Sequence, residues 1–286
     1  LAIFAMGFGS TFGTFNAANA VDLAANDIWA DGISSAAGTI TDPSNNMAVD
    51  LKGYKISAVT AGDGLNFGAI TDTGTNDGTG ISFTIINTNG GGALTQSVAS
   101  MNVDGIVNIL NIDDEDDLTV TLTGTGANTI GGALNLTSVE ATEDKDILFN
   151  VQGSLVVTGI TTLTAAAGSA ASNSELIVDK AATFTGGVVL NDDTGLAILA
   201  FEQGNTVTIA GDITAAANNE GTIKLTGAGK TLSGDIGTSA VKLKEIEVGA
   251  ASGNFTGTVF TTLLDVNQAV TLTGAVTVGT ATIDAA

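Results

Sequence analysis

Polar and apolar positions in the second half of this chain follow a short recurring phrase. The phrase is a β-forming residue, an apolar residue, then Thr, Ser or Ala, a glycine, any residue, and finally Val or Ile. Its copies lie at 129–134, 157–160, 183–188, 207–213, 231–236, 255–259 and 270–276. Their glycines are Gly132, Gly159, Gly186, Gly211, Gly234, Gly257 and Gly274, with spacings of 27, 27, 25, 23, 23 and 17 residues.

A period in this range is typical of repeat proteins, in which each unit buries its apolar face against the next. About 23 residues provide two or three strands of ordinary length with their turns. Stacked coils of this size place Val, Ile and Leu inside, Thr outside, and glycine at the corners. The pattern therefore predicts an all-β chain with a parallel β-solenoid (β-helix) over residues 118–286. A pair of antiparallel β-sandwich domains is the alternative, because hairpins also give short strands and glycine turns.

Strand-like runs continue through most of the C-terminal part of the chain. The expected strands lie at 118–124, 146–151, 155–159, 175–179, 182–190, 195–201, 205–214, 222–227, 241–248, 254–260 and 269–283. Residues 21–112 contain similar runs without a firm period, and 22–30, which includes Trp29, suggests a short helical turn. The acidic run 113–117 interrupts the pattern. We therefore expect an N-terminal strand at 1–20, an irregular β domain at 21–117 and the repeat domain at 118–286.

The first twenty residues carry no charge and alternate large with small side chains. Phe4, Met6, Phe8 and Phe12 are separated by Ala and Gly, which places bulky apolar groups on one face of a strand. Such a strand can dock by β-strand addition on a neighbouring subunit. An ordinary core strand within the chain, or the remnant of a signal peptide cleaved after Ala20, are the other interpretations.

Composition removes several kinds of chemistry. Among 286 residues there is no His, no Cys and no Arg, and the net charge is −22. A Ser-His-Asp triad, a Cys nucleophile, a His or Cys zinc site and a disulfide are therefore excluded. The charge repels nucleic acid and anionic membranes. Carbohydrate cleavage by paired carboxylates lacks its usual aromatic and basic partners, so we do not expect an enzyme.

Two acidic segments are candidates for calcium. Asp113, Asp114, Glu115, Asp116 and Asp117 place five carboxylates together, and Ca²⁺ takes six to eight oxygen ligands. A solvated acidic turn is the simpler interpretation, because neighbours on a strand point to opposite faces. The segment 72–78 has oxygen-bearing residues at alternate positions but lacks a terminal bidentate Glu. Calcium is the one cofactor that the sequence suggests.

The phrases at 227–237 and 254–259 resemble the passenger regions of bacterial autotransporters, most of all the rickettsial surface-layer-like outer-membrane protein B group. The resemblance extends over residues 118–286 and lies in the Gly/Thr/Asn texture of the repeats. It implies a secreted β-solenoid that coats cells or adheres to a host. No site residue carries over, because the shared motif is structural.

Together these observations predict an extracellular, self-assembling structural protein, a subunit of a bacterial or archaeal surface layer, sheath or filament. Its partner would be itself, with contact to a cell envelope or host surface and no transmembrane span. An adhesin, an autotransporter passenger or a fibre segment that binds a surface ligand is the alternative.

Overall fold

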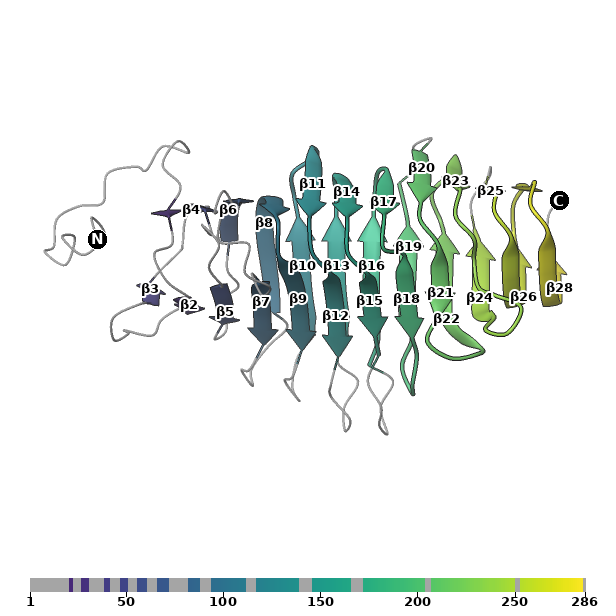
Figure 1. The fold of residues 1–286 in the computed structure, drawn as a ribbon, viewed down its shortest axis with the longest axis horizontal. Helices are drawn as coiled ribbons and strands as arrows, with labels where there is room; N and C mark the ends of the chain where they lie inside the picture. The colour runs from purple at the N-terminus through teal and green to yellow at the C-terminus, as the bar shows by residue number, and fades with distance from the viewer. Residues whose placement is uncertain are drawn as a thin grey trace, which may run out of the picture.

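The chain forms an elongated stack of β-coils in a computed structural model (Figure 1). Backbone and side chains are described for residues 97–111, 117–138, 146–165, 172–203, 208–249 and 253–284. The backbone alone is described for the strands between residues 21 and 96 and for residue 207. Strands lie across the long axis of the stack, and the coils follow one another in sequence order from the N-terminal to the C-terminal side (Figure 1).

Each complete coil contributes one strand to each of three faces, which we name after the strands of one coil. The β10 face contains β10 (Leu118–Leu122), β13 (Ile147–Val151), β16 (Ser174–Val178), β19 (Ala197–Phe201), β22 (Glu220–Leu225) and β24 (Leu243–Val248). The β11 face contains β11 (Ala127–Ile130), β14 (Ser154–Val157), β17 (Ala182–Phe184), β20 (Val207–Ala210), β23 (Lys230–Leu232), β25 (Gly253–Phe255) and β27 (Val270–Leu272). The β12 face contains β9 (Ile106–Asn111), β12 (Leu134–Ser138), β15 (Thr161–Thr164), β18 (Val188–Asn191) and β21 (Ile213–Ala215).

The remaining strands extend these faces at both ends of the stack. On the N-terminal side, β1 (Val21–Asp22), β4 (Met47–Asp50), β6 (Asn66–Thr71) and β8 (Leu94–Val103) continue into β10 and β11. The β12 face is extended by β2 (Asp27–Ala30), β3 (Thr39–Thr41), β5 (Ile56–Thr60) and β7 (Ser82–Asn87). At the C-terminal side, β26 (Val259–Val266) and β28 (Val276–Ile283) each bend from the β12 face into the β10 face.

Every ladder among the described strands is parallel, and together they make a 19-stranded and a 9-stranded sheet. About 5 turns of solenoid span residues 97–255, and the described part contains no helix. The predicted parallel β-solenoid is confirmed. The antiparallel sandwich alternative is wrong, because no two described strands pair as a hairpin.

The recurring glycines form a column at the corner between the β11 and β12 faces. The first β12-face positions of successive coils are Leu134, Thr161, Val188, Ile213, Ile236, Val259 and Val276, and they pair in that order. Each lies two residues after a phrase glycine, so the glycine spacing is the coil length. A Cβ on Gly159 would lie 2.6 Å from the carbonyl carbon of Gly132 in the coil before it. Glycine is needed here because the backbones of successive corners leave no room for a side chain.

The other positions of the phrase have equally specific places. Its apolar residue points into the core, as Leu232 and Phe255 do. Its hydroxyl residue lies outside the corner, where Ser233 Oγ donates to the carbonyl of Ile209 at 3.2 Å. Thr273 Oγ1 makes the same bond to the carbonyl of Phe255 at 3.0 Å. The phrase therefore describes one corner of the solenoid, residue by residue.

The copy at 157–160 departs from this arrangement. Ile160 fills the position between glycine and core, and 51% of its side chain is exposed. Thr161 takes the inward position instead, between Leu134 and Val188, and is completely buried. Its hydroxyl oxygen has no hydrogen-bond partner. The expectation that Ile160 is the core residue of this copy is wrong, because Gly159 is followed by one spacer residue, as in the other copies.

A single apolar core runs the length of the side-chain-described stack. Strands such as β10 and β13 alternate buried with half-buried residues, which is the period of a strand with one face inward. Phe149, Phe184, Phe201 and Phe255 are the largest apolar side chains that are fully buried. The outward Thr119 and Thr121 are half-buried between neighbouring coils. This agrees with the expected distribution of Val, Ile and Leu inside and Thr outside.

Parallel ladders also include the strands before residue 112. β9 pairs with both β7 and β12, and β8 pairs with both β6 and β10, so the ladders pass from one side of the acidic run 113–117 to the other. The expected helical turn at 22–30 is wrong, since β1 and β2 are strands there and β2 pairs with β3 and β5. Ladder bonds to neighbouring coils override the local preference. The proposed division into domains stays a prediction.

Candidate functional site

A groove of about 300 Å³ lies on the outer surface of the β10 face. Outward side chains of successive strands make its floor, and corner residues before those strands make its acidic rim. We call it the β10 groove; it is lined by Asp117, Leu118, Thr119, Asp146, Ile147, Leu148, Asn173, Glu175, Ile198 and Lys224.

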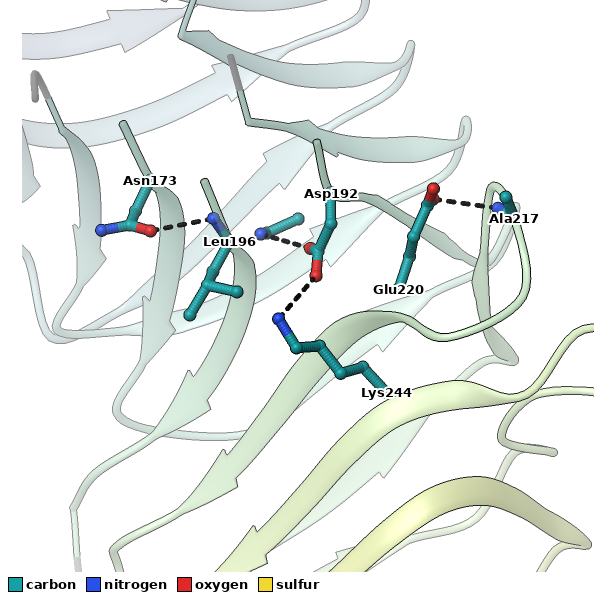
Figure 2. A network of polar contacts seen from close by, with 7 residues as sticks. Asn173, Asp192, Leu196, Ala217, Glu220 and Lys244 are labelled. Atoms are coloured by element: carbon teal, nitrogen blue, oxygen red, sulfur yellow. Dashed lines mark hydrogen bonds and ion pairs between the residues drawn. The ribbon is translucent and has the colours of Figure 1, made fainter. Parts of the chain in front are cut away.

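The acidic rim is built by side chains that bond the coil after their own. Asp117 Oδ1 accepts the backbone N–H of Asp146 at 3.0 Å, and Asp146 Oδ1 accepts that of Asn173 at 2.7 Å. Asn173 Oδ1 then accepts the N–H of Leu196 at 2.8 Å (Figure 2). One oxygen of each side chain is therefore used to join two coils. The spacing of these three residues, 29 and 27, is the sequence signal that would have found this column.

Glu175 is the titratable group that lies deepest in the β10 groove. Burial raises the pKa of its carboxyl above the usual value. The ammonium of Lys224 opposes this rise, whereas the carboxylates of Glu202 and Asp146 add to it. The groove thus holds a carboxylate in a poorly hydrated, mostly anionic setting, with one lysine beside it.

An apolar cluster adjoins this groove on the outer surface. Ile177, Ile198 and Ala200 are buried on the outward side of β16 and β19, and Leu148 and Leu196 pack against them. The cluster is separate from the main core, because these side chains lie on the opposite face of the sheet. It gives one side of the rod a surface that differs from the Thr and Asn elsewhere.

Beside the groove, Asp192 is a buried carboxylate with two defined partners (Figure 2). Its Oδ1 accepts the backbone N–H of Ala197 at 2.7 Å, and its Oδ2 lies 3.7 Å from Lys244 Nζ. The side chain of Asp192 is 6% exposed and that of Lys244 is 41% exposed. Nearby, Glu220 Oε2 accepts the N–H of Ala217 at 2.9 Å and closes the turn before β22.

Three lysines reach backward across two coils. Lys244 does so toward Asp192, and Lys180 Nζ donates to the carbonyl of Thr125 at 2.7 Å. Lys230 Nζ donates to the carbonyl of Asp179 at 3.4 Å, and Lys230 is fully buried. Burial lowers the pKa of the Lys230 ammonium, and the Asp179 carboxylate opposes that shift. In an arginine-free chain, lysine side chains thus link coils that do not touch directly.

A second, more open groove of about 340 Å³ lies at the glycine corner. It contains Asp212 and Asp235, which follow phrase glycines and continue the same kind of ladder. Asp212 Oδ1 accepts the N–H of Asp235 at 2.9 Å, and Asp235 Oδ1 accepts that of Thr258 at 2.7 Å. The bond from Thr258 lowers the pKa of the Asp235 carboxyl. These carboxylates stabilise the stack as anions.

The sequence-predicted site residues are only partly within the described chain. Asp117 is exposed, and its Oδ1 is bonded to the next coil; Asp113 to Asp116 lie outside the described residues, as does the segment 72–78. Phe4, Met6, Phe8 and Phe12 also lie outside them. Where side chains are described, no three metal-ligating groups gather at one point. Calcium binding by the acidic run therefore stays a prediction.

Comparison with known proteins adds no relative. No protein-family model, curated protein or solved structure matches this chain. In the part of the chain that the structure describes, no helix is long and apolar enough to cross a membrane. Function must therefore be inferred from the fold, the surface chemistry and the ends of the stack.

Proposed function

We propose that this chain is an extracellular structural protein that assembles with copies of itself, as a subunit of a surface layer, sheath or filament. The main support is the last coil of the described stack. Leu272 and Ile283 lie at inward positions of β27 and β28, yet they are 38% and 68% exposed. Core-type side chains beside an unpaired strand edge favour the addition of another β-strand.

The construction of the rod supports a mechanical role. Glycines, corner hydroxyls, corner carboxylates and lysines each bond or pack against neighbouring coils, as described above. Such a rod is held by many small contacts, with no disulfide, metal or bound cofactor among its described links. Work outside a cell, where a chain must persist without repair, fits this construction.

The net charge of −22 sets the conditions for assembly. Subunits repel one another at low ionic strength, and cations screen that repulsion over about 10 Å at 0.1 M salt. We expect polymers to form more readily with added salt or Ca²⁺. Light scattering with and without chelator separates specific calcium from general screening, since only specific calcium is removed by chelator at constant ionic strength.

A second candidate function is adhesion, as in autotransporter passengers, whose repeat texture this chain resembles. The β10 groove favours it, because an apolar cluster beside an acidic rim is a surface on which a ligand can bind. Negative-stain microscopy of the purified protein distinguishes the two. Ordered polymers support the structural role, whereas isolated rods under all salt and calcium conditions would contradict it and favour the adhesin.

A further inference from the structure

The last described coil exposes both a backbone edge and the end of the core. Within the described chain, β28 pairs only with β26, so its other edge is unpaired. Next to that edge lie Leu272 and Ile283, with Val276 and Val278 partly buried against the core. An added strand with bulky apolar side chains on one face would cover these residues and satisfy the edge.

We propose that the occupant of this end is the segment 1–20 of a second copy of the chain, added as a strand alongside β28. This inference rests on the proposed function and names its contact. Phe4, Met6 and Phe8 recur at every second residue, so a strand would present them together. Gly and Ala between them leave the other face slim.

Charge favours this occupant over other parts of the chain. Residues 1–21 contain no charged side chain, in a protein whose net charge is −22. The receiving end is anionic: Asp265 and Asp284 lie on β26 and just after β28, and no lysine follows Lys244. An uncharged apolar segment docks there without the repulsion that other segments would meet.

Geometry decides that the docking is between copies. Eleven successive ladders join β1 to β28, and at about 4.8 Å per ladder the two strands are about 53 Å apart. If residues 4–12 pair with β28, residues 13–20 must span the rest of the way to β1. Eight extended residues reach about 29 Å at most. A segment therefore cannot dock on its own chain, and head-to-tail docking between copies produces an open filament.

The test combines two variants that should each fail to polymerise alone. Deletion of residues 1–20 removes the donor strand, and Ile283→Asp blocks the acceptor end. Ile160→Asp is the matched control, because Ile160 is also exposed but lies at a corner in mid-rod. Leu272→Asp serves as a second acceptor variant, and circular dichroism with thermal melting confirms that each protein folds.

Sedimentation velocity under polymerising conditions gives the readout. We expect polymers from the wild-type protein and from Ile160→Asp, and monomers from the deletion and from both acceptor variants. An equimolar mixture of the deletion protein with full-length Ile283→Asp should form a heterodimer of twice the monomer mass, since one supplies the acceptor and the other the donor. Polymers from the deletion protein, or no heterodimer in the mixture, overturn this inference alone. A wild-type protein that stays monomeric overturns the proposed function itself.

Discussion

A Cβ atom on Gly234 would lie 1.9 Å from the carbonyl oxygen of Gly211, the equivalent residue one coil earlier. The same relation links Gly257 to Gly234 at 2.2 Å and Gly274 to Gly257 at 1.9 Å. These distances are far below any contact that a real Cβ makes with a backbone oxygen. The glycine column thus sets how closely successive coils approach at this corner.

Gly234→Ala should therefore destabilise the solenoid strongly. The obstacle is backbone, which cannot turn aside as a flexible side chain can, so we expect a loss of at least about 3 kcal/mol in the free energy of unfolding. Urea unfolding followed by circular dichroism measures it. Gly126→Ala is the control, since a Cβ there meets nothing within 4 Å and should change stability by less than about 0.5 kcal/mol. Equal effects at the two positions would contradict the close approach of the corners.

Thr161→Val should stabilise the protein. The hydroxyl of Thr161 is buried without a partner, and its neighbours in the same column are Leu134 and Val188. Valine keeps the shape and removes the unpaired polar group, so we expect a gain of about 1–2 kcal/mol. Thr162→Val, on the outward side of the same strand, should change little. A loss of stability in Thr161→Val would show that the hydroxyl has a partner, for example a buried water.

Much of the repeat region could be predicted from the sequence, because glycine spacing and coil length are the same quantity in this fold. The column begins one coil earlier than the phrases indicated: Gly132 stacks on Gly105, 27 residues before it. This copy escaped notice because Asp104 replaces the usual Thr, Ser or Ala. Strand β2 was also missed, since its pairing with β5 depends on residues 29 positions away.

The candidate site was harder to predict. An aspartate that bonds the next coil looks the same in sequence as an aspartate in a solvated turn, and only the fold places Asp146 beside Asn173. Long contacts such as Lys244 to Asp192 span 52 residues and carry no local signal. Position within the coil, rather than residue type, decides which polar groups hold the stack together.

Lys244→Met should destabilise the protein through Asp192. Without the lysine, the carboxylate stays buried with the N–H of Ala197 as its one described bond. We expect a loss of about 1 kcal/mol, limited by the partial exposure of Lys244. Asp192→Asn keeps an oxygen for Ala197, so adding Lys244→Met to that variant should cost almost nothing. A double-mutant cycle on chemical unfolding measures the coupling, and equal losses in both backgrounds would show that the pair does not interact.

Glu175→Gln should raise stability at neutral pH and change its pH dependence. Because burial raises the pKa of Glu175 in the folded protein, the folded state holds this proton more tightly than the unfolded state. The wild-type protein should therefore gain stability from this group as pH falls from the raised pKa to the ordinary one, and bear the full penalty above it. Glutamine removes both effects. Asp235 acts in the opposite sense, losing its contribution below the ordinary pKa.

Thermal melts across the acidic range test this prediction. Glu247→Gln, which also removes one negative charge from an outward position on the β10 face, is the control for net charge. A pH profile of Glu175→Gln parallel to that of the wild-type protein would show that Glu175 does not titrate as its burial implies.

The most direct test of the stacked-coil account is the removal of one complete coil. Deleting residues 161–187 joins Ile160 to Val188, so that β18 takes the place of β15 on β12, and every corner stays in register. We predict a cooperatively folding protein whose rod is shorter by about 4.8 Å. The control is deletion of residues 161–173, which leaves part of a coil behind and should abolish cooperative unfolding. Loss of folding in the full-coil deletion, or equal tolerance of both deletions, would contradict the assignment of one coil to each glycine phrase.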